Sequence, residues 1–543
     1  MGARSPEMQP VDLVEVDADD AALVPGPPSP SRQSRQSRQS RQPRPVGAWS
    51  ARRSAGTPHD AAPDASGAAA SDGAAGRAGG SGAARGPWSA GPPRRRRLLA
   101  AAAVVAAVAV GTASVASERQ ETARLTALAD VPGVIAPVTA PLVELWRSDD
   151  GVRASLTAVA GLVVGVTAPR ERSQDVAVAA LDAATGRTRW RTTLVPTGAT
   201  TGGRATCVVP DAGVGVREDE RVVVCHSVDE LGPSPRDLSR IEPRAARLLV
   251  LDVADGTVLA ERTVDPSISI DALGTDIVVK ETLADGRLRV ARTDPTGEHT
   301  RWTFHTDPRI LGREYSPVLV DDGLVVVPGA EGWVLTGDGE VVHAWEPRRP
   351  AAAAWADVQR GAVMLRPLRD LIGRTDVVEL STGRAFTTDG FPLRPWTDDG
   401  SSGDLVLVQG SRGQGLMAQR LGSGDVVWAV PGDDTGGTLV IDGRVLRVEE
   451  GLLRSMDAAT GTTIWQADVP TWSLYGLYTD GRLVLRTEVD ADRRTVLAAR
   501  GLDDGRLRWS SPVADGLEQL IVLDHRLLGL TEDGLVAFGP APA

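Results

Sequence analysis

The side chains that could carry redox, metal or acid–base chemistry are few in this sequence of 543 residues. The histidines are scattered, with no pair four residues apart and no grouping with cysteine, so the spacing of a zinc site is missing. No serine lies in a nucleophile elbow, and no glycine-rich phosphate loop carries its lysine. We therefore predict no catalytic residue and no metal site. The six histidines are His59, His226, His299, His305, His343 and His525.

The only two cysteines, Cys207 and Cys225, lie in segments rich in β-branched residues that could pair as a hairpin. Two buried free thiols are the alternative, but oxidation is favoured if this part of the chain lies outside the cell membrane. We predict a disulfide, which would contribute about 3 kcal/mol by closing a loop of this size.

The acidic segment Asp398–Asp404 has carboxylates close enough together to suggest a site for a hard cation such as calcium. Asp, Gly and Ser are also the residues that form solvated turns. We favour the turn for this segment.

A repeated phrase occurs throughout residues 142–540 and predicts the elements around these residues. Its strong copies have a glycine followed four residues later by tryptophan, and they end at Trp190, Trp428, Trp465 and Trp509. In weaker copies the spacing or the residue differs, as at Ala260, Trp302, Trp345 and Phe386.

Each copy predicts two alternating strands joined by a turn, because glycine tolerates the positive φ that such a turn needs. Another alternating pair precedes most copies, so one unit is about four short strands, the size of a propeller blade. A four-stranded sheet with two apolar faces needs neighbours on both sides, and a large indole ring is suited to fill the seam between them.

This phrase resembles the tryptophan-docking motif of the PQQ-like β-propeller family, here in a membrane-anchored actinobacterial type. The resemblance implies an all-β propeller over residues 142–540, with about eight four-stranded blades and a possible range of seven to nine. Ala260 and Phe386 depart from the pattern and leave the docking of their blades open. The docking residues that we expect are Trp146, Trp190, Trp302, Trp345, Trp428, Trp465 and Trp509.

The two ends of this region indicate how the ring closes. Leu142–Trp146 has a tryptophan but no repeat before it, and Leu535–Phe538 is a last strand without a tryptophan partner. We expect them to complete one blade together, which leaves no open sheet edge at the junction.

Residues 98–117 form an uncharged, apolar stretch of 20 residues, long enough for a transmembrane helix. Four arginines, Arg94 to Arg97, precede it, so we predict a single span in the plasma membrane with the N-terminus in the cytoplasm and the propeller outside. A cleaved signal peptide is the alternative. Residues 118–141 are expected to be a linker.

Residues 1–97 are poor in large apolar side chains and are predicted to be a disordered cytoplasmic tail. Within it, residues 11–24 alternate apolar and acidic side chains and could bind a cytoplasmic partner. The tail carries 14 arginines and nine acidic residues, a net charge of +5. Because the formal net charge of the whole chain is −12, the remainder carries −17. A remainder this acidic argues against nucleic acid as a partner.

These features favour a non-catalytic binding or scaffolding module that holds a protein or another cell-envelope ligand. Four tryptophans lie outside the docking positions, and we favour a place in the blade core for each; a cluster of them on one rim would instead indicate a site for sugar or peptide. They are Trp333, Trp355, Trp396 and Trp472. The family resemblance also implies a PQQ-dependent membrane-bound oxidoreductase as an alternative. Its enzymes hold PQQ and calcium, typically beside a disulfide of adjacent cysteines, whereas these cysteines are 18 residues apart. No cofactor is therefore predicted. A sensor that couples an external ligand to the tail is the third possibility.

Overall fold

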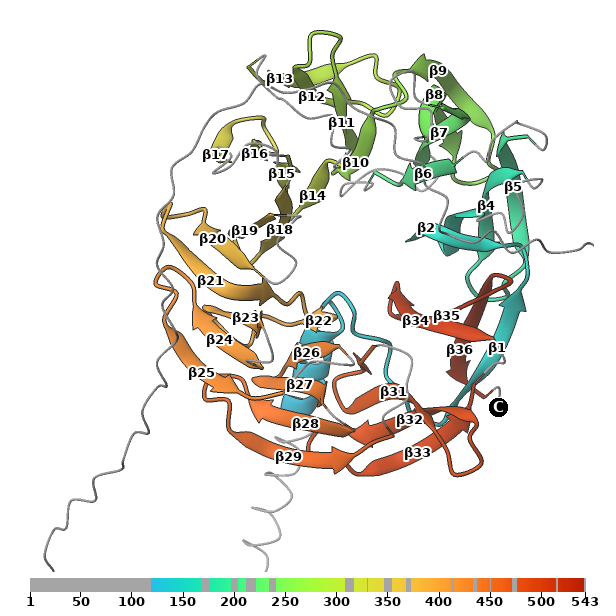
Figure 1. The fold of residues 1–543 in the computed structure, drawn as a ribbon. Coiled ribbons are helices and arrows are strands. Elements are labelled where there is room, and N and C mark those ends of the chain that lie inside the picture. The colour runs from blue at the N-terminus through green and yellow to red at the C-terminus, as the bar shows by residue number, and fades with distance from the viewer. Residues whose placement is uncertain are drawn as a thin grey trace, which may run out of the picture. The chain divides into compact units, whose positions relative to one another are not determined.

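The computed structural model describes residues 119–541 apart from short gaps, and Figure 1 shows the arrangement of its strands. The gaps are 168–174, 197–203, 211–220, 234–240, 308–316, 330, 346–353, 368–372, 412–414, 433–436, 450, 471–475 and 514–515. The predicted tail (1–97), the predicted transmembrane helix (98–117) and the tail segment 11–24 lie outside the described residues. Within the part that is described, no helix has the length and apolar character needed to cross a bilayer.

The repeated phrase forms a hairpin with a glycine turn. In its first copy, Ala180 lies opposite Trp190, and Gly186 has a φ of +68°. The amide of Gly186 donates to the carbonyl of Asp182 at 2.8 Å, while the Asp182 carboxylate accepts the amide of Thr185 at 3.0 Å. A β-bulge follows Ala180, so the strands twist more strongly at the turn end.

The first four blades are regular groups of four antiparallel strands. Blade 1 consists of β2 (Val152–Val159), β3 (Leu162–Thr167), β4 (Val176–Asp182) and β5 (Thr188–Val195). Blade 2 consists of β6 (Arg204–Val208), β7 (Val222–Pro233), β8 (Ile241–Asp252) and β9 (Val258–Val264). Blade 3 consists of β10 (Ser269–Leu273), β11 (Asp276–Thr282), β12 (Leu288–Thr293) and β13 (Thr300–His305). Blade 4 consists of β14 (Leu319–Asp321), β15 (Leu324–Val327), β16 (Gly332–Thr336) and β17 (Val341–Trp345).

The next two blades share one strand. Blade 5 consists of β18 (Ala354–Gln359), β19 (Ala362–Pro367), β20 (Arg374–Glu379) and β21 (Ala385–Pro392). Blade 6 consists of the end of β21 with β23 (Leu405–Gly410), β24 (Leu416–Arg420) and β25 (Val426–Val430). Residues 385–389 of β21 pair with β20, and residues 390–392 pair with β23, so the two blades form one seven-stranded sheet.

The last three blades include an added inner strand and the closing pair. Blade 7 consists of β22 (Thr397–Asp398), β26 (Thr438–Ile441), β27 (Arg444–Glu449), β28 (Leu452–Asp457) and β29 (Thr463–Asp468). Blade 8 consists of β30 (Tyr478–Thr479), β31 (Leu483–Val489), β32 (Thr495–Gly501) and β33 (Leu507–Pro512). The closing blade consists of β34 (Leu517–Leu523), β35 (Arg526–Thr531), β36 (Leu535–Pro540) and β1 (Leu142–Ser148).

The described residues therefore form eight hydrogen-bonded sheets, in agreement with the predicted all-β propeller of about eight sheets. Because the seven-stranded sheet contains two blade-sized groups, the ring has nine groups, which is within the expected range of seven to nine. The predicted closure is confirmed: β1 pairs antiparallel with β36, with Leu142 opposite Pro540 and Ser148 opposite Leu535.

The core lies in the seams between neighbouring blades. In one seam, Val164 of β3 and Val178 of β4 pack in the same cluster as Val223 of β7 and Leu249 of β8, all almost fully buried. Burial of both faces follows from the stacking, because each sheet is covered by the next one.

The segment predicted as a linker is folded against the propeller. Residues 119–128 form a helix, and Leu128 is buried in a cluster with Leu439 of β26 and Leu477 beside β30. Beyond the helix, Val134 forms a parallel bridge with Thr479 of β30. The amide of Ala136 donates to the carbonyl of His525 in the closing blade at 2.7 Å.

Candidate functional site

Five of the expected docking tryptophans contact the next blade in the same way. The indole Nε1 of each donates to a backbone carbonyl of the neighbouring blade, and its ring lies over the turn glycine there. The hydrogen bonds join Trp146 to Ala183 (3.2 Å), Trp190 to Val253 (2.7 Å), Trp302 to Gly337 (2.8 Å), Trp428 to Ala458 (2.9 Å) and Trp465 to Leu502 (2.8 Å). The glycines are Gly186, Gly256, Gly339, Gly461 and Gly505, in the same order.

The glycine is required by close approach as well as by its positive φ. A Cβ atom on Gly186 would lie 2.4 Å from the ring of Trp146, and one on Gly505 would lie 2.4 Å from that of Trp465. No larger residue fits these turns unless the indole moves. In each of these five seams, a tryptophan on one blade therefore fits a glycine on the next.

Phe386 and the blade of Ala260 dock in ways that the spacing did not predict. The ring of Phe386 lies over Gly424 of blade 6, where a tryptophan lies in other seams. Phe386 comes three residues after its turn glycine because this hairpin lacks the bulge residue. In blade 2, the Arg262 guanidinium lies over Gly297 in place of an aromatic ring.

Trp345 and Trp509 lie differently from the five. Trp345 packs at the seam with blade 5, but its ring lies over Gly332 of its own blade. Its Nε1 is 3.5 Å from the carbonyl oxygen of Gly329. His343, four residues after the turn glycine, is in register with the docking position, opposite Val334 and before the bulge. Trp509 is half-buried against the apolar cluster of the closing blade.

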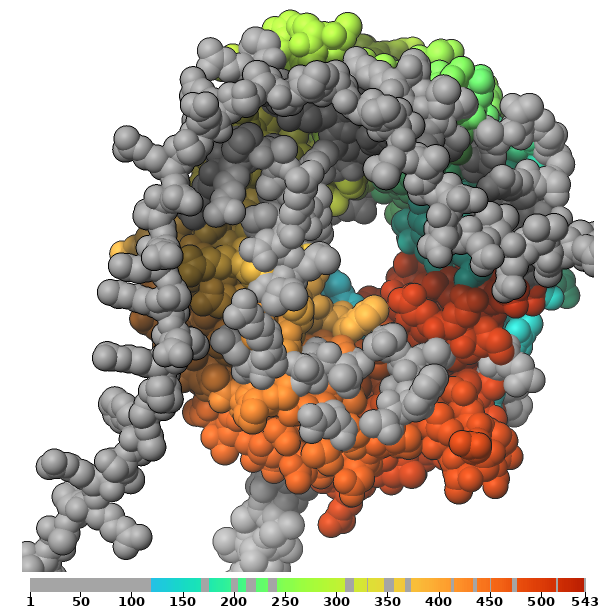
Figure 2. Space-filling view, in the orientation of Figure 1, coloured from blue at the N-terminus to red at the C-terminus, as the bar shows by residue number. Residues whose placement is uncertain are grey.

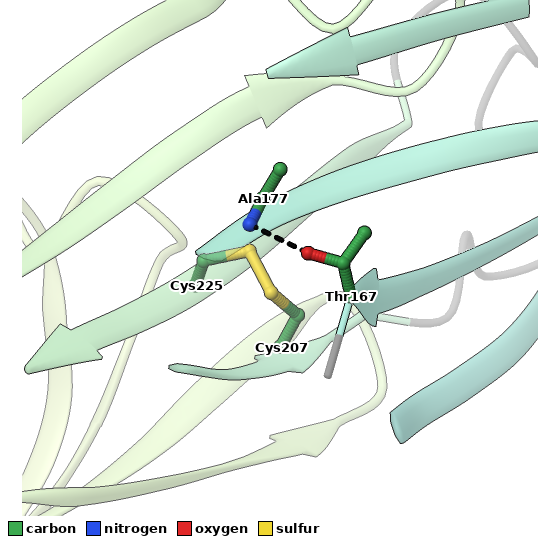
Figure 3. The surroundings of a disulfide bond; sticks show 4 residues. All are labelled: Thr167, Ala177, Cys207 and Cys225. Atoms are coloured by element: carbon green, nitrogen blue, oxygen red, sulfur yellow. Dashed lines mark hydrogen bonds between the residues drawn. A yellow bond between two sulfur atoms is a disulfide. The ribbon is translucent and has the colours of Figure 1, made fainter. Parts of the chain in front are cut away.

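The predicted disulfide is present and joins β6 to β7 within blade 2 (Figure 3). Cys207 and Cys225 are directly opposite each other, with their Cα atoms 4.1 Å apart. Both are buried in the seam with blade 1, where the amide of Ala177 donates to the Thr167 hydroxyl at 2.9 Å. The bridge fastens the innermost strand of its blade, which is otherwise short.

His226, next to Cys225, gives blade 2 a pH-dependent stability. Burial and the nearby Arg204 lower the pKa of His226 to about 4, from an ordinary value of 6.5. Since the unfolded chain binds the proton more readily, stability is complete above pH 6.5 and is lost as the pH falls toward 4. Between pH 7 and 5 we expect a loss of about 2 kcal/mol from this residue.

Urea denaturation of the wild type and His226→Gln at both pH values measures this effect. The variant should lose less stability on acidification than the wild type. An equal loss in the two proteins would contradict the assignment to His226.

The acidic segment Asp398–Asp404 is held by protein groups. Nε of Arg360 donates to Asp398 at 3.0 Å, and the amide of Asp442 donates to Asp399 at 2.6 Å. Asp404 forms an ion pair with Arg420 at 2.7 Å. Among the described residues, no three His, Cys, Asp or Glu side chains are grouped as metal ligands. The hydrogen bonds and the ion pair that these carboxylates form with protein groups are those of a turn.

The residues between β21 and β22 include Trp396, the most exposed aromatic side chain among the described residues. The sheet order places β22 inside β26, at the inner edge of blade 7 (Figure 1). Just before it, Trp396 is 42 % exposed, and its ring lies 6.2 Å from that of Tyr478 on β30. The Trp396 amide donates to the carbonyl of Thr438 at 2.9 Å, which fixes the backbone.

Arg394, two residues earlier, joins this segment to the inner strands of blades 4 and 5. Its guanidinium forms ion pairs with Asp321 at the end of β14, at 2.9 Å, and with Asp357 on β18, at 3.3 Å. The Arg394 side chain is still 61 % exposed, so it can bind a further acceptor. Figure 2 shows an opening in the middle of the ring. We define the inner-wall site as Arg394, Trp396, Asp321 and Asp357.

Among the other tryptophans outside the docking positions, Trp333 packs elsewhere. Trp333 lies half-buried on β16, 5.7 Å between centroids from the ring of Phe304 in blade 3. Trp355 lies on β18, and Trp472 falls outside the described residues. Sequence reasoning named Trp396 as a candidate but missed Arg394, which has no motif around it.

The described residues do not fit PQQ in the way that its enzymes hold it. The disulfide is a cross-strand bridge buried inside blade 2, with Cys225 0 % and Cys207 6 % exposed, so its sulfurs cannot support a cofactor ring on the axis. The acidic segment is engaged with arginines and backbone amides, as described above.

Comparison with known proteins places the repeats in a family. The family model described as outer membrane protein assembly factor BamB matches residues 173–344 and 375–527, more than half of the chain. A search of curated proteins gives no match.

Solved structures with a similar course of the chain share little sequence with it. BamB from Moraxella catarrhalis is 15 % identical with a TM-score of 0.38, covering 74 % of this chain and 97 % of its own. Quinohemoprotein alcohol dehydrogenase from Comamonas testosteroni is 12 % identical with a TM-score of 0.39, covering 76 % and 79 %. Saccharomyces cerevisiae Sqt1 is 11 % identical with a TM-score of 0.38, covering 76 % and 100 %. At these values no activity or partner is transferred. The family match, together with the repeated hairpins and their docked tryptophans, identifies the chain as a member of the PQQ-like, BamB-type β-propeller repeat family.

Proposed function

We propose that the protein is a non-catalytic binding or scaffolding module, anchored in the plasma membrane by residues 98–117 with its propeller outside. The ligand is a protein or another component of the cell envelope, and it binds at the inner-wall site. The anchor and its direction rest on the uncharged stretch and on the arginines before it. The disulfide supports an oxidising compartment for the propeller.

The observation that carries the binding role is the pairing of an exposed aromatic with an exposed cation on a rigid wall. Trp396 and Arg394 are two residues apart in the sequence. A backbone hydrogen bond holds Trp396 and ion pairs hold Arg394, yet both side chains stay exposed. Aromatic and arginine side chains contribute most strongly to binding interfaces. A rigid wall lowers the entropy cost of binding.

Site-directed photo-crosslinking in intact cells tests the proposal. A photoreactive phenylalanine analogue at position 396 should give a discrete crosslinked product that Arg394→Ala reduces severalfold. The same analogue at Leu259, an exposed residue on the outer strand β9, is the control and should give little product. Equal crosslinking at both positions would overturn the assignment of the inner wall.

Two other functions have distinct tests. For a PQQ-dependent oxidoreductase, stoichiometric uptake of PQQ with calcium, followed by absorbance, would replace the binding proposal. For a sensor, a peptide of residues 11–24 should retain a specific cytoplasmic partner, and its failure to do so would remove that function.

A further inference from the structure

The helix of residues 119–128 is attached to one end of blades 7 and 8. Nη2 of Arg124 donates to the carbonyl of Gly481 at 3.0 Å, and Nη1 forms an ion pair with Asp442 at 3.5 Å. Glu121 accepts from Nε of Arg482 at 3.1 Å. Arg124 and Arg482 together lower the pKa of Glu121 to about 2, so this carboxylate stays charged at neutral pH. Leu128 closes the contact against Gly481.

These contacts lie on the turns that join β26 to β27, β30 to β31 and β34 to β35. Asp442 precedes β27, Gly481 precedes β31, and His525, which contacts Val134 through Nδ1 at 2.9 Å, precedes β35. Nη2 of Arg444 reaches Asp503 at 2.9 Å, so the turn between β32 and β33 belongs to the same end. We call this end of blades 7, 8 and the closing blade the turn face.

The predicted span ends next to this face. Only Glu118 separates Ser117 from Arg119, the first described residue of the helix. Two residue steps cover at most about 7 Å of extended chain. If the chain leaves the bilayer at Ser117, the helix must begin close to the lipid surface. The turns that the helix contacts are then close to this surface as well.

We propose that residues 119–138 hold the propeller in one orientation, with the turn face against the bilayer and the opposite end directed away from it. This inference rests on the proposed membrane anchor. The partner of the turn face is the lipid surface next to the anchor. The helix is attached by ion pairs, by a hydrogen bond from Arg124 to a backbone carbonyl and by a buried leucine, so the mount is fixed. A flexible linker would let the propeller rotate.

Two matched labelling positions on blade 8 test the orientation. Asp492 precedes β32 and Asp503 follows it, so they lie at its two ends. Their side chains are 73 % and 84 % exposed, and each forms a surface ion pair at 2.9 Å. Both native cysteines are in the disulfide, so a maleimide fluorophore labels only the introduced thiol in Asp503→Cys or Asp492→Cys.

The full chain is reconstituted in vesicles that contain a headgroup-labelled acceptor lipid, and energy transfer is measured at each position. We expect transfer from position 503 to exceed that from position 492 by about twofold, since the length of β32 separates them by roughly 20 Å. Equal transfer, or the reverse order, would overturn the orientation.

A flexible insertion and a flotation assay separate this inference from the anchor itself. Ten Gly/Ser residues inserted after Ser117, which leave the folded region untouched, add a mean reach of roughly 17 Å and should bring the two transfer values together. An unchanged difference would mean that the short connection does not set the orientation. If the chain fails to float with the vesicles, the proposed anchor itself is wrong, whereas flotation with equal transfer rejects only the mount.

Discussion

Trp465→Ala should destabilise the propeller by about 4 kcal/mol, because large-to-small changes of a buried tryptophan cost about 3–5 kcal/mol. The indole is 9 % exposed, its Nε1 donates to the carbonyl of Leu502 at 2.8 Å, and its ring covers Gly505. The substitution leaves a cavity between blades 7 and 8 and removes a hydrogen bond across the seam. Chemical denaturation of the full chain in detergent measures the loss.

Trp345→Ala is the matched control for this prediction. Trp345 is half-buried, and its Nε1 is 3.5 Å from its acceptor, within its own blade. We expect less than half of the loss found for Trp465→Ala, because this indole covers no turn glycine of the next blade. Similar losses in the two variants would mean that aromatic burial alone, and not docking on the neighbouring turn, stabilises the seams.

Removal of the disulfide with Cys207→Ala and Cys225→Ala together should lower the free energy of unfolding by about 3 kcal/mol. The bridge closes a loop of 18 residues and holds β6 on β7, and the wild-type chain should show the same loss when reduced. Both measurements use urea denaturation at pH 7, with and without reductant.

The double variant provides the control, since reductant should leave its stability unchanged. Alkylation of the unreduced, denatured wild type should modify no thiol. Two modified cysteines, or a reductant effect of equal size in the variant, would contradict a stabilising bridge.

Local sequence rules were sufficient for the repeating elements. A glycine with positive φ, and a tryptophan four residues after it, define a hairpin through contacts only a few residues apart. Trp190, Trp428 and Trp465 therefore lie at equivalent positions in the structure, each opposite the residue before a bulge. The pairing of β1 with β36 also followed from the sequence, because each end alone had half of a repeat.

Only the tertiary structure decided which side chain fills each seam. In blade 4, His343 has the four-residue spacing from the turn glycine, yet Trp345 packs at the seam with blade 5 while its ring covers Gly332 of its own blade. Arg262 covers Gly297 with its guanidinium, a flat group that occupies the place of an aromatic ring, and composition gives no rule for that exchange.

The sequence by itself determined the blade, its turn glycine, the disulfide partners and the two halves of the closing sheet, because these depend on neighbours along one or two strands. The tertiary structure decided the inner-wall site and the attachment of residues 119–138. Arg394 meets Asp321 and Asp357, and Arg124 meets Asp442, only after the ring has brought distant strands together. Contacts between residues that are tens to hundreds of positions apart follow from how the sheets stack, and no local pattern of residue types encodes them.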